Sequence, residues 1–460
     1  MLLYLLLFSI IFLWMIAYIL NKKDVLSPPN TICFSFIIAI LFGICNIKTW
    51  NFYMGERTFW VVTIGILSFF IGYFIIYYYM ELKYKNINIV NVDNGVIIKN
   101  KKLYLFIFIE CITFILIYHT INGIPGESLG EKILMSRVAS STAALNTELE
   151  VDEYKVNSMV YSLYWFCYAG TIMVLYKCVM DYISGEKVQK KFFLVFLLMI
   201  LMTLLLGTRG SIIYLIITGF IMAYMLWLKK YKWKKRLSKK FFLKVFFIVL
   251  VVVFLFSTIG LIIVGREEQL NEFSGSLLEN IFFQLSIYIG APLKLMDLYL
   301  YTDYGVDENF PVPGYATFGQ FYRFIARRIG FDNWNDVNIL SIEFRTDNTV
   351  MLGNVYTMFM KYVEDFGFLG LAILCLIMGI IFAYMYEKIK YNKFNKRNID
   401  ICLIIYAYLF KALILAFFAD LFYANVDWSF IRILISFKLF EFIFIECSIK
   451  EYKKREINDT

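Results

Sequence analysis

Apolar segments long enough to cross a membrane recur along the chain, with polar or charged breaks between them. A helix needs about 20 apolar residues to span the ~30 Å hydrocarbon core of a bilayer. Because lipid offers the backbone no hydrogen bonds, each segment is predicted to be an α-helix. The predicted spans are 2–20, 31–47, 59–80, 103–121, 159–180, 192–207, 211–228, 241–264, 366–386, 399–418 and 429–447. We therefore expect an all-α, polytopic integral membrane protein with about 11 transmembrane helices.

The composition agrees with burial in lipid. Hydrophobic residues make up 60% of the chain, whereas a soluble domain usually holds about 45–50%. The net charge of +9 includes a basic run at 229–240. This run lies between two apolar segments, which is typical of a cytoplasmic loop and not of a nucleic-acid site. All eight cysteines fall within apolar segments without metal-ligand spacing, so neither a disulfide framework nor a zinc site is expected.

The distribution of Lys and Arg predicts the orientation. With the N-terminus outside and the C-terminus in the cytoplasm, the cytoplasmic segments hold 27 basic residues. The outer segments are much longer and hold 12. Basic residues are retained on the cytoplasmic side, so this orientation is favoured over its inverse.

These spans divide the chain into three parts. Residues 1–264 are predicted to form an N-terminal bundle of about eight spans, and 265–365 a large extracytoplasmic loop between the eighth and ninth spans. Residues 366–460 supply about three further spans and a basic cytoplasmic tail. Within the loop, the apolar stretch 281–300 is interrupted by Gln284, Lys294 and Asp297. We expect it to form helices that lie at the membrane surface or dip partly into it.

A second amphipathic stretch follows the turn at 311–314. Phe318, Phe321, Tyr322 and Ile325 recur at helical spacing, and Arg323 and Arg327 stand one turn apart. One interpretation is an interfacial helix whose arginines reach into the headgroups. The other is a helix that presents its arginines to phosphate.

Three further basic residues fall in the outer half of predicted spans. Arg209 lies in the Gly-Thr-Arg-Gly turn at 207–210, Lys411 in the tenth span and Arg432 in the eleventh. If these helices are neighbours, the three side chains form a basic pocket for a lipid-linked diphosphate, which guanidinium groups bind bidentately. The alternative is a structural role, with ion pairs to Asp420 or Asp427.

Two other ionisable residues lie within predicted spans. His119, the only histidine, ends the fourth span on the outer side and is a candidate general base. Its alternative is a polar cap at the interface. Glu110 falls in the inner half of the same span, so it is not a candidate for chemistry at the outer face.

The most specific stretch re-enters the membrane after the large loop. It reads Gly-Asn-Val-Tyr-Thr at 353–357 and Tyr-Val-Glu-Asp-Phe-Gly-Phe-Leu-Gly at 362–370. This stretch resembles a signature of the Wzy-type polymerases of O-antigen and capsular oligosaccharide repeat units. The turn around Arg209 and the large loop in the latter half of the chain also resemble that family.

The resemblance implies glycosyl transfer at the outer face of the bacterial cytoplasmic (inner) membrane. A growing glycan on undecaprenyl diphosphate would pass to a sugar hydroxyl of a new lipid-linked repeat unit. Arg209 would neutralise the leaving diphosphate, assisted by Arg266, Arg345 and other substrate-binding residues, namely Arg323, Arg327, Lys411, Arg432 and Tyr356. An arginine-to-glycine loop pattern of some members is absent after Arg266 and Arg345. The candidate bases are Asp365, Asp347 and His119, in that order.

The resemblance also sets the expected partners. These are the bilayer, the lipid-linked oligosaccharides, a chain-length regulator and a flippase, with no nucleic acid, metal or other cofactor. Two alternatives remain open, a lipid-linked glycan ligase of related fold and a polysaccharide flippase or transporter. Internal repeats and discontinuous spans are typical of transporters. No repeat is evident in the sequence.

Overall fold

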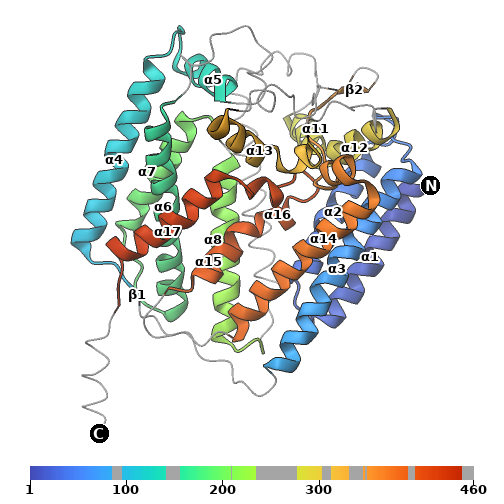
Figure 1. Ribbon diagram of the computed structural model, residues 1–460, viewed down its shortest axis with the longest axis horizontal. Coiled ribbons are helices and arrows are strands. Elements are labelled where there is room, and N and C mark those ends of the chain that lie inside the picture. The colour runs from blue at the N-terminus through green and yellow to red at the C-terminus, as the bar shows by residue number, and fades with distance from the viewer. Residues whose placement is uncertain are drawn as a thin grey trace. The chain divides into compact units, whose positions relative to one another are not determined.

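Apolar helices dominate the part of the chain that the structure describes. A computed structural model describes residues 1–84, 96–140, 156–208, 210–234, 277–302, 312–330, 345–347, 350–391 and 399–447 (Figure 1). Within these residues, seven helices are long and apolar enough to cross a membrane. They are α1 Leu2–Leu20, α2 Pro28–Cys45, α3 Glu56–Lys83, α4 Asn100–Asn122, α6 Ser158–Ser184, α8 Gly210–Lys230 and α14 Phe359–Tyr391.

Three other predicted spans form shorter helices. Helix α7 (Phe192–Leu205) has 14 residues, about 21 Å of helix. The tenth span, predicted over 399–418, corresponds to the apolar helical stretch Ile401–Ile414, which comprises α15 (Ile401–Leu409) and a short helix, α16 (Lys411–Ile414). The eleventh span is α17 (Trp428–Phe444). The eighth predicted span, 241–264, lies outside the described residues, so the total of about eleven stays a prediction.

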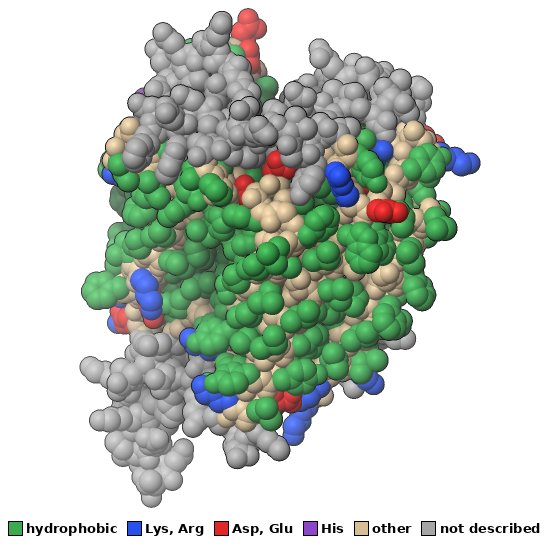
Figure 2. Space-filling view, turned by 45° about the vertical axis from the view of Figure 1, so that its right-hand side comes forward, with side chains coloured by type: hydrophobic (Ala, Val, Ile, Leu, Met, Phe, Trp, Pro, Cys, Tyr) green, Lys and Arg blue, Asp and Glu red, His purple; other side chains and the backbone are tan. Residues whose placement is uncertain are grey.

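Figure 2 shows how side chains distribute on one face of the molecule. Hydrophobic side chains cover a broad middle band, and most of the coloured Lys, Arg, Asp and Glu side chains lie towards its two ends. Large apolar side chains on α1, including Phe8, Phe12 and Ile19, are more than half exposed. Exposure of this kind is expected of a helix whose outer face meets lipid.

The chain forms two compact units, each made of several segments. Unit 1 holds residues 1–85, 267–387 and 409–428, and unit 2 holds 86–266, 388–408 and 429–460. This division joins the predicted loop to the first three spans. The three-part division predicted from the sequence describes topology across a bilayer, and it stays a prediction.

In unit 1, the apolar stretch of the large loop forms two helices, as expected. Helix α11 (Leu277–Ile289) and helix α12 (Ala291–Thr302) are separated at Gly290 and pack against α2. A side chain at Gly290 would come within 3.1 Å of the Gly43 nitrogen in α2. The break predicted at this glycine therefore lets two backbones approach closely.

The rest of the described loop residues form α13 (Tyr315–Ile329) and a hairpin. Helix α13 follows Gly314, whose φ of 86° is in the left-handed region. Strands β2 (Arg345–Asp347) and β3 (Val350–Gly353) pair antiparallel. Helix α14 then begins at Phe359 and is interrupted at Gly367, where φ is 61° and ψ is −163°.

Unit 2 is built around α4, α6, α7 and α8, with a short helix α5 (Leu129–Ser140) after α4. Strands β1 (Val96–Ile97) and β4 (Glu446–Cys447) pair antiparallel. The Glu446 carboxylate forms ion pairs with Lys99 and Lys102. These contacts fasten the start of α4 to the end of α17.

Glycines allow the spans α3 and α14 of unit 1 to touch along their backbones. A Cβ at Gly72 of α3 would lie 2.1 Å from the Leu376 carbonyl oxygen, and one at Gly379 of α14 would lie 2.2 Å from that of Phe69. Neither neighbour is a flexible side chain, so nothing can move aside cheaply. Small residues at such crossings replace hydrophobic attraction, which lipid does not provide, with close van der Waals packing.

We predict that Gly72→Ala and Gly379→Ala each destabilise the protein by about 1–3 kcal/mol, because an overpacked contact forces the helices apart. Thermal unfolding of the purified protein in detergent measures this. Gly123→Ala is the matched control, because its nearest heavy atom would be 3.5 Å away and its φ of −71° suits any residue. Equal melting temperatures for all three variants would contradict the close crossing.

Candidate functional site

The first turns of α14 join this span to the surface helix α13 in unit 1. The Asp365 carboxylate accepts the backbone N–H of Ala316 on Oδ1 at 3.0 Å and that of Thr317 on Oδ2 at 2.6 Å. The Thr317 hydroxyl donates to the Lys361 carbonyl at 3.3 Å. The first amides of a helix have no acceptor within it and carry partial positive charge. Asp365 therefore caps α13 from a neighbouring helix, with both carboxylate oxygens engaged.

A second carboxylate, Asp420, lies buried beside this junction. Its Oδ1 accepts the Tyr362 hydroxyl at 2.8 Å and the backbone N–H groups of Phe422 and Tyr423 at 3.0 Å each. Burial raises the pKa of the Asp420 carboxyl, and Lys361 and these hydrogen bonds oppose that rise. Asp420 thereby fixes the turn that leads into the short helix η4 (Tyr423–Asn425).

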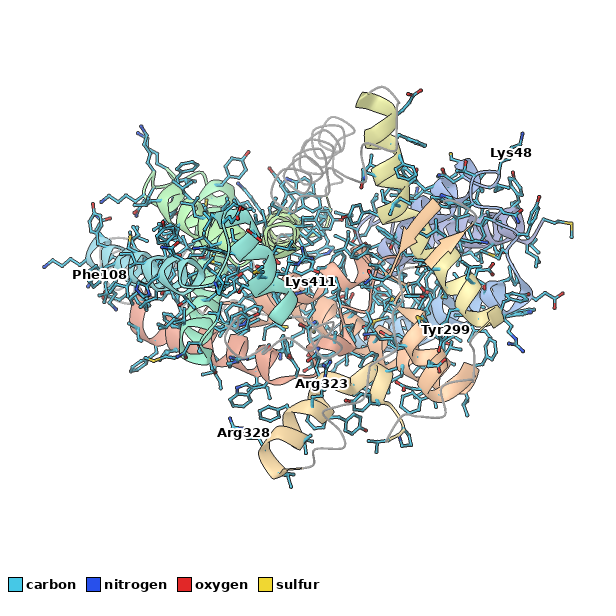
Figure 3. The ribbon with its side chains drawn as sticks, turned by 90° about the horizontal axis from the view of Figure 1, so that it is seen from above. Lys48, Phe108, Tyr299, Arg323, Arg328 and Lys411 are labelled. Atoms are coloured by element: carbon cyan, nitrogen blue, oxygen red, sulfur yellow. The ribbon has the colours of Figure 1, made fainter. Side chains whose placement is uncertain are left out.

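Helix α13 packs on this turn through aromatic rings. Phe318 meets Tyr423 edge-on at 5.6 Å between centroids, and Phe324 stacks on Trp428 at 5.3 Å. These contacts place Arg323 on the packed side of α13, where it is 7% exposed. Arg328 is exposed, with its guanidinium 5.7 Å from the Phe324 ring (Figure 3). The helix thus buries one arginine and leaves another in the open.

Lys411 lies within the predicted tenth span, as the first residue of α16. It is 4% exposed, and Asp427 attracts its charge. Charges at such depth are rare in membrane proteins and mark candidate sites. This electrostatic partner agrees with the structural role considered for Lys411.

Of the remaining predicted binding residues in unit 1, Tyr356 is placed by aromatic packing. It is 8% exposed and meets the Tyr299 ring of α12 edge-on, with 6.1 Å between centroids. Tyr356 therefore links the motif stretch before α14 to α12, a helix whose residues are nearly all buried.

Two predicted site residues of unit 2 lie among the described residues. His119 is exposed near the end of α4, where its carbonyl accepts the Gly123 N–H at 3.1 Å. Arg432 in α17 donates from Nη1 to the Ser162 hydroxyl of α6 at 3.4 Å. Each residue is positioned by its own helix, and neither carries further evidence of a catalytic role.

Several predicted residues are not placed. Arg209 and Arg266 lie outside the described residues. The backbone of Arg345 and Asp347 is described in β2 and that of Arg327 in α13, without their side chains. The basic pocket of Arg209, Lys411 and Arg432 accordingly stays a prediction.

No functional role was predicted for Asp297, although it joins two helices of unit 1 as Asp365 does. Its Oδ1 accepts the Gly55 N–H at 2.9 Å and the Thr58 hydroxyl at 2.6 Å, at the start of α3. Burial raises the pKa of this carboxyl, and the two hydrogen bonds oppose the rise. The neighbouring Lys294 donates to the Asn51 carbonyl at 3.3 Å. The sequence feature that could have indicated their importance is that Lys294 and Asp297 interrupt an apolar stretch.

Comparison with known proteins adds nothing to this geometry. No protein-family profile, curated protein or solved structure matches the chain. Within the described ranges, no group of three or more His, Cys, Asp or Glu side chains could hold a metal ion.

Asp365→Ala should destabilise the protein by about 0.5–2 kcal/mol, the usual cost of losing a helix cap. Asp365→Asn should cost less, because the amide keeps one acceptor oxygen for α13. Thermal unfolding in detergent tests both variants against Glu186→Gln, a change of an exposed carboxylate outside this junction. An Asp365→Asn protein of wild-type stability that has lost its activity would instead indicate a direct role in chemistry.

Proposed function

We propose that the chain is a glycosyltransferase of the bacterial cytoplasmic membrane. It would join undecaprenyl-diphosphate-linked oligosaccharide repeat units into O-antigen or capsular polysaccharide at the outer face. The observation that carries this proposal concerns the stretch 353–370, which resembles the repeat-unit polymerases. That stretch opens α14, and its Asp365 holds the arginine-bearing helix α13 in place.

The chemistry defines what the site has to supply. A sugar hydroxyl oxygen forms a bond to the anomeric carbon of the donor glycan, and the bond from that carbon to the diphosphate oxygen breaks. The hydroxyl proton leaves to a base, and the diphosphate leaves with the lipid. Cationic side chains stabilise this departing charge most where water is excluded. Buried Arg323 has the donor geometry for such a role, with Lys411 as a second buried cation in unit 1.

The hydrogen bonds of Asp365 reduce the number of candidates for the general base. Asp365 uses both oxygens to hold α13, so the proposal gives it a positioning role instead of proton transfer. Asp347 and His119 remain as base candidates. The basic-residue asymmetry predicts that the N-terminus and residues 265–365 lie outside, and α13 would then face the side on which lipid-linked units are displayed.

Deletion of the gene should leave single repeat units on the lipid carrier or at the surface and abolish long glycan. The reason is that only the joining step is removed. Gel analysis of glycan length with mass spectrometry of the lipid carrier measures this. Long polymer retained on the carrier would indicate the alternative ligase, and units confined to the cytoplasmic face would indicate the flippase or transporter.

Arg323→Ala should reduce long glycan at least tenfold while the membrane protein level stays within about twofold. A tenfold loss corresponds to about 1.4 kcal/mol of transition-state stabilisation. Arg323→Lys should recover little, because an ammonium cannot replace the planar fork of donors. Arg328→Ala is the matched control on the same helix, since Arg328 is exposed, and should keep normal chain length. Normal polymer from well-expressed Arg323→Ala would remove Arg323 from the site.

A further inference from the structure

Glu110 lies at the middle of α4 and on its buried face in unit 2. The buried residues of α4 recur at helical spacing, as Leu103, Phe106, Ile107, Glu110, Thr113, Ile117 and Ile121. Glu110 is 0% exposed and stands ten residues from the start of the helix, about 15 Å along its axis. An acidic side chain therefore lies near the middle of the helix, on a buried face that is largely apolar.

The neighbours of Glu110 across this contact are small polar side chains of α6. The Thr171 hydroxyl lies 3.1 Å from Glu110 Oε1 and 2.8 Å from the Cys167 carbonyl oxygen. The Cys167 thiol donates to the Thr113 hydroxyl at 3.5 Å, and that hydroxyl donates to the Ile109 carbonyl at 2.8 Å. Together they form a closed polar cluster between α4 and α6.

Counting protons in this cluster decides the state of Glu110. The Thr171 hydroxyl has one proton, and the shorter contact assigns it to the Cys167 carbonyl. The contact to Glu110 is then a hydrogen bond only if Oε1 itself carries a proton and donates it to Thr171. If Thr171 instead donated to a carboxylate, the Cys167 carbonyl would lose this hydrogen bond, while Oε2 would still have no hydrogen-bond partner among the described residues.

No charge in the described part of the chain compensates an ionised Glu110. None of its ion pairs involves Glu110, and the titratable side chain that faces it, Cys167, is a thiol that donates its proton elsewhere. An unpaired carboxylate in hydrocarbon costs several kcal/mol or more, and such groups become neutral instead.

We propose that Glu110, with Thr171 as its hydrogen-bond acceptor, is a proton-binding site embedded in the membrane. The ligand is a single proton held on Oε1, and the α4–α6 contact at mid-span is built around the neutral acid. This inference is independent of the glycosyl transfer proposed above, because it concerns no residue of that site.

Infrared spectroscopy of the purified full-length protein in bilayers at neutral pH tests the proposal without a reagent having to reach the site. The difference spectrum between the wild type and Glu110→Gln should contain the C=O stretch of a protonated carboxylic acid. The control Glu186→Gln, at an exposed carboxylate, should remove only the two carboxylate bands. Carboxylate bands in the Glu110 difference spectrum would overturn the proposal, because they would show that Glu110 is ionised. This holds whether a sodium ion or a basic side chain balances its charge.

Thermal unfolding supplies a second measurement. Glu110→Gln substitutes a neutral group of the same shape whose amide can donate to Thr171, so its melting temperature should stay within about 2 °C of the wild type. An ionised and paired Glu110 would make the same variant strongly destabilised, because a buried partner would lose its countercharge.

Discussion

In unit 1, carboxylates provide the acceptors that the first amides of neighbouring helices lack. Asp297 of α12 accepts hydrogen bonds at the start of the span α3, and Asp365 of α14 accepts two at the start of α13. An amide without an acceptor is costly wherever water is absent. Each carboxylate therefore provides an acceptor at a helix end and also fixes the position of one helix of unit 1 relative to another. Arg323 lies on the helix that Asp365 caps in this way, and the aromatic contacts of Phe318 and Phe324 place it on the packed side of α13.

In the middle of unit 2, a buried carboxyl group also needs a hydrogen-bond partner, and it has a different kind of partner. Glu110 meets a hydroxyl instead of a row of helix amides, and a hydroxyl already committed to a carbonyl can only accept. At a helix end the negative charge is stabilised by several N–H groups, whereas at mid-span the proton itself completes the hydrogen bond. The two kinds of site show why carboxylates near helix ends serve as anchors and why one at mid-span binds a proton.

The helices were predictable from the sequence because length and hydropathy suffice to identify them. The first span was placed at 2–20 and is α1 (Leu2–Leu20), and the break at Gly290 was expected from its glycine and proline. The interruption of α14 at Gly367 was not expected, because tertiary contacts decide where a span is interrupted. Asp365 was predicted as a base, and its partners Ala316 and Thr317 lie 49 and 48 residues away. Such pairings need the fold, since no local pattern encodes them.

The proposed function requires that this chain itself catalyses the joining of lipid-linked repeat units. The most direct test supplies purified protein in bilayers with undecaprenyl-diphosphate-linked repeat units and resolves the products by length. The account predicts products of two or more units on the carrier, with one undecaprenyl diphosphate released for each linkage formed. Repeat units that remain single while the protein is folded and correctly oriented would contradict it.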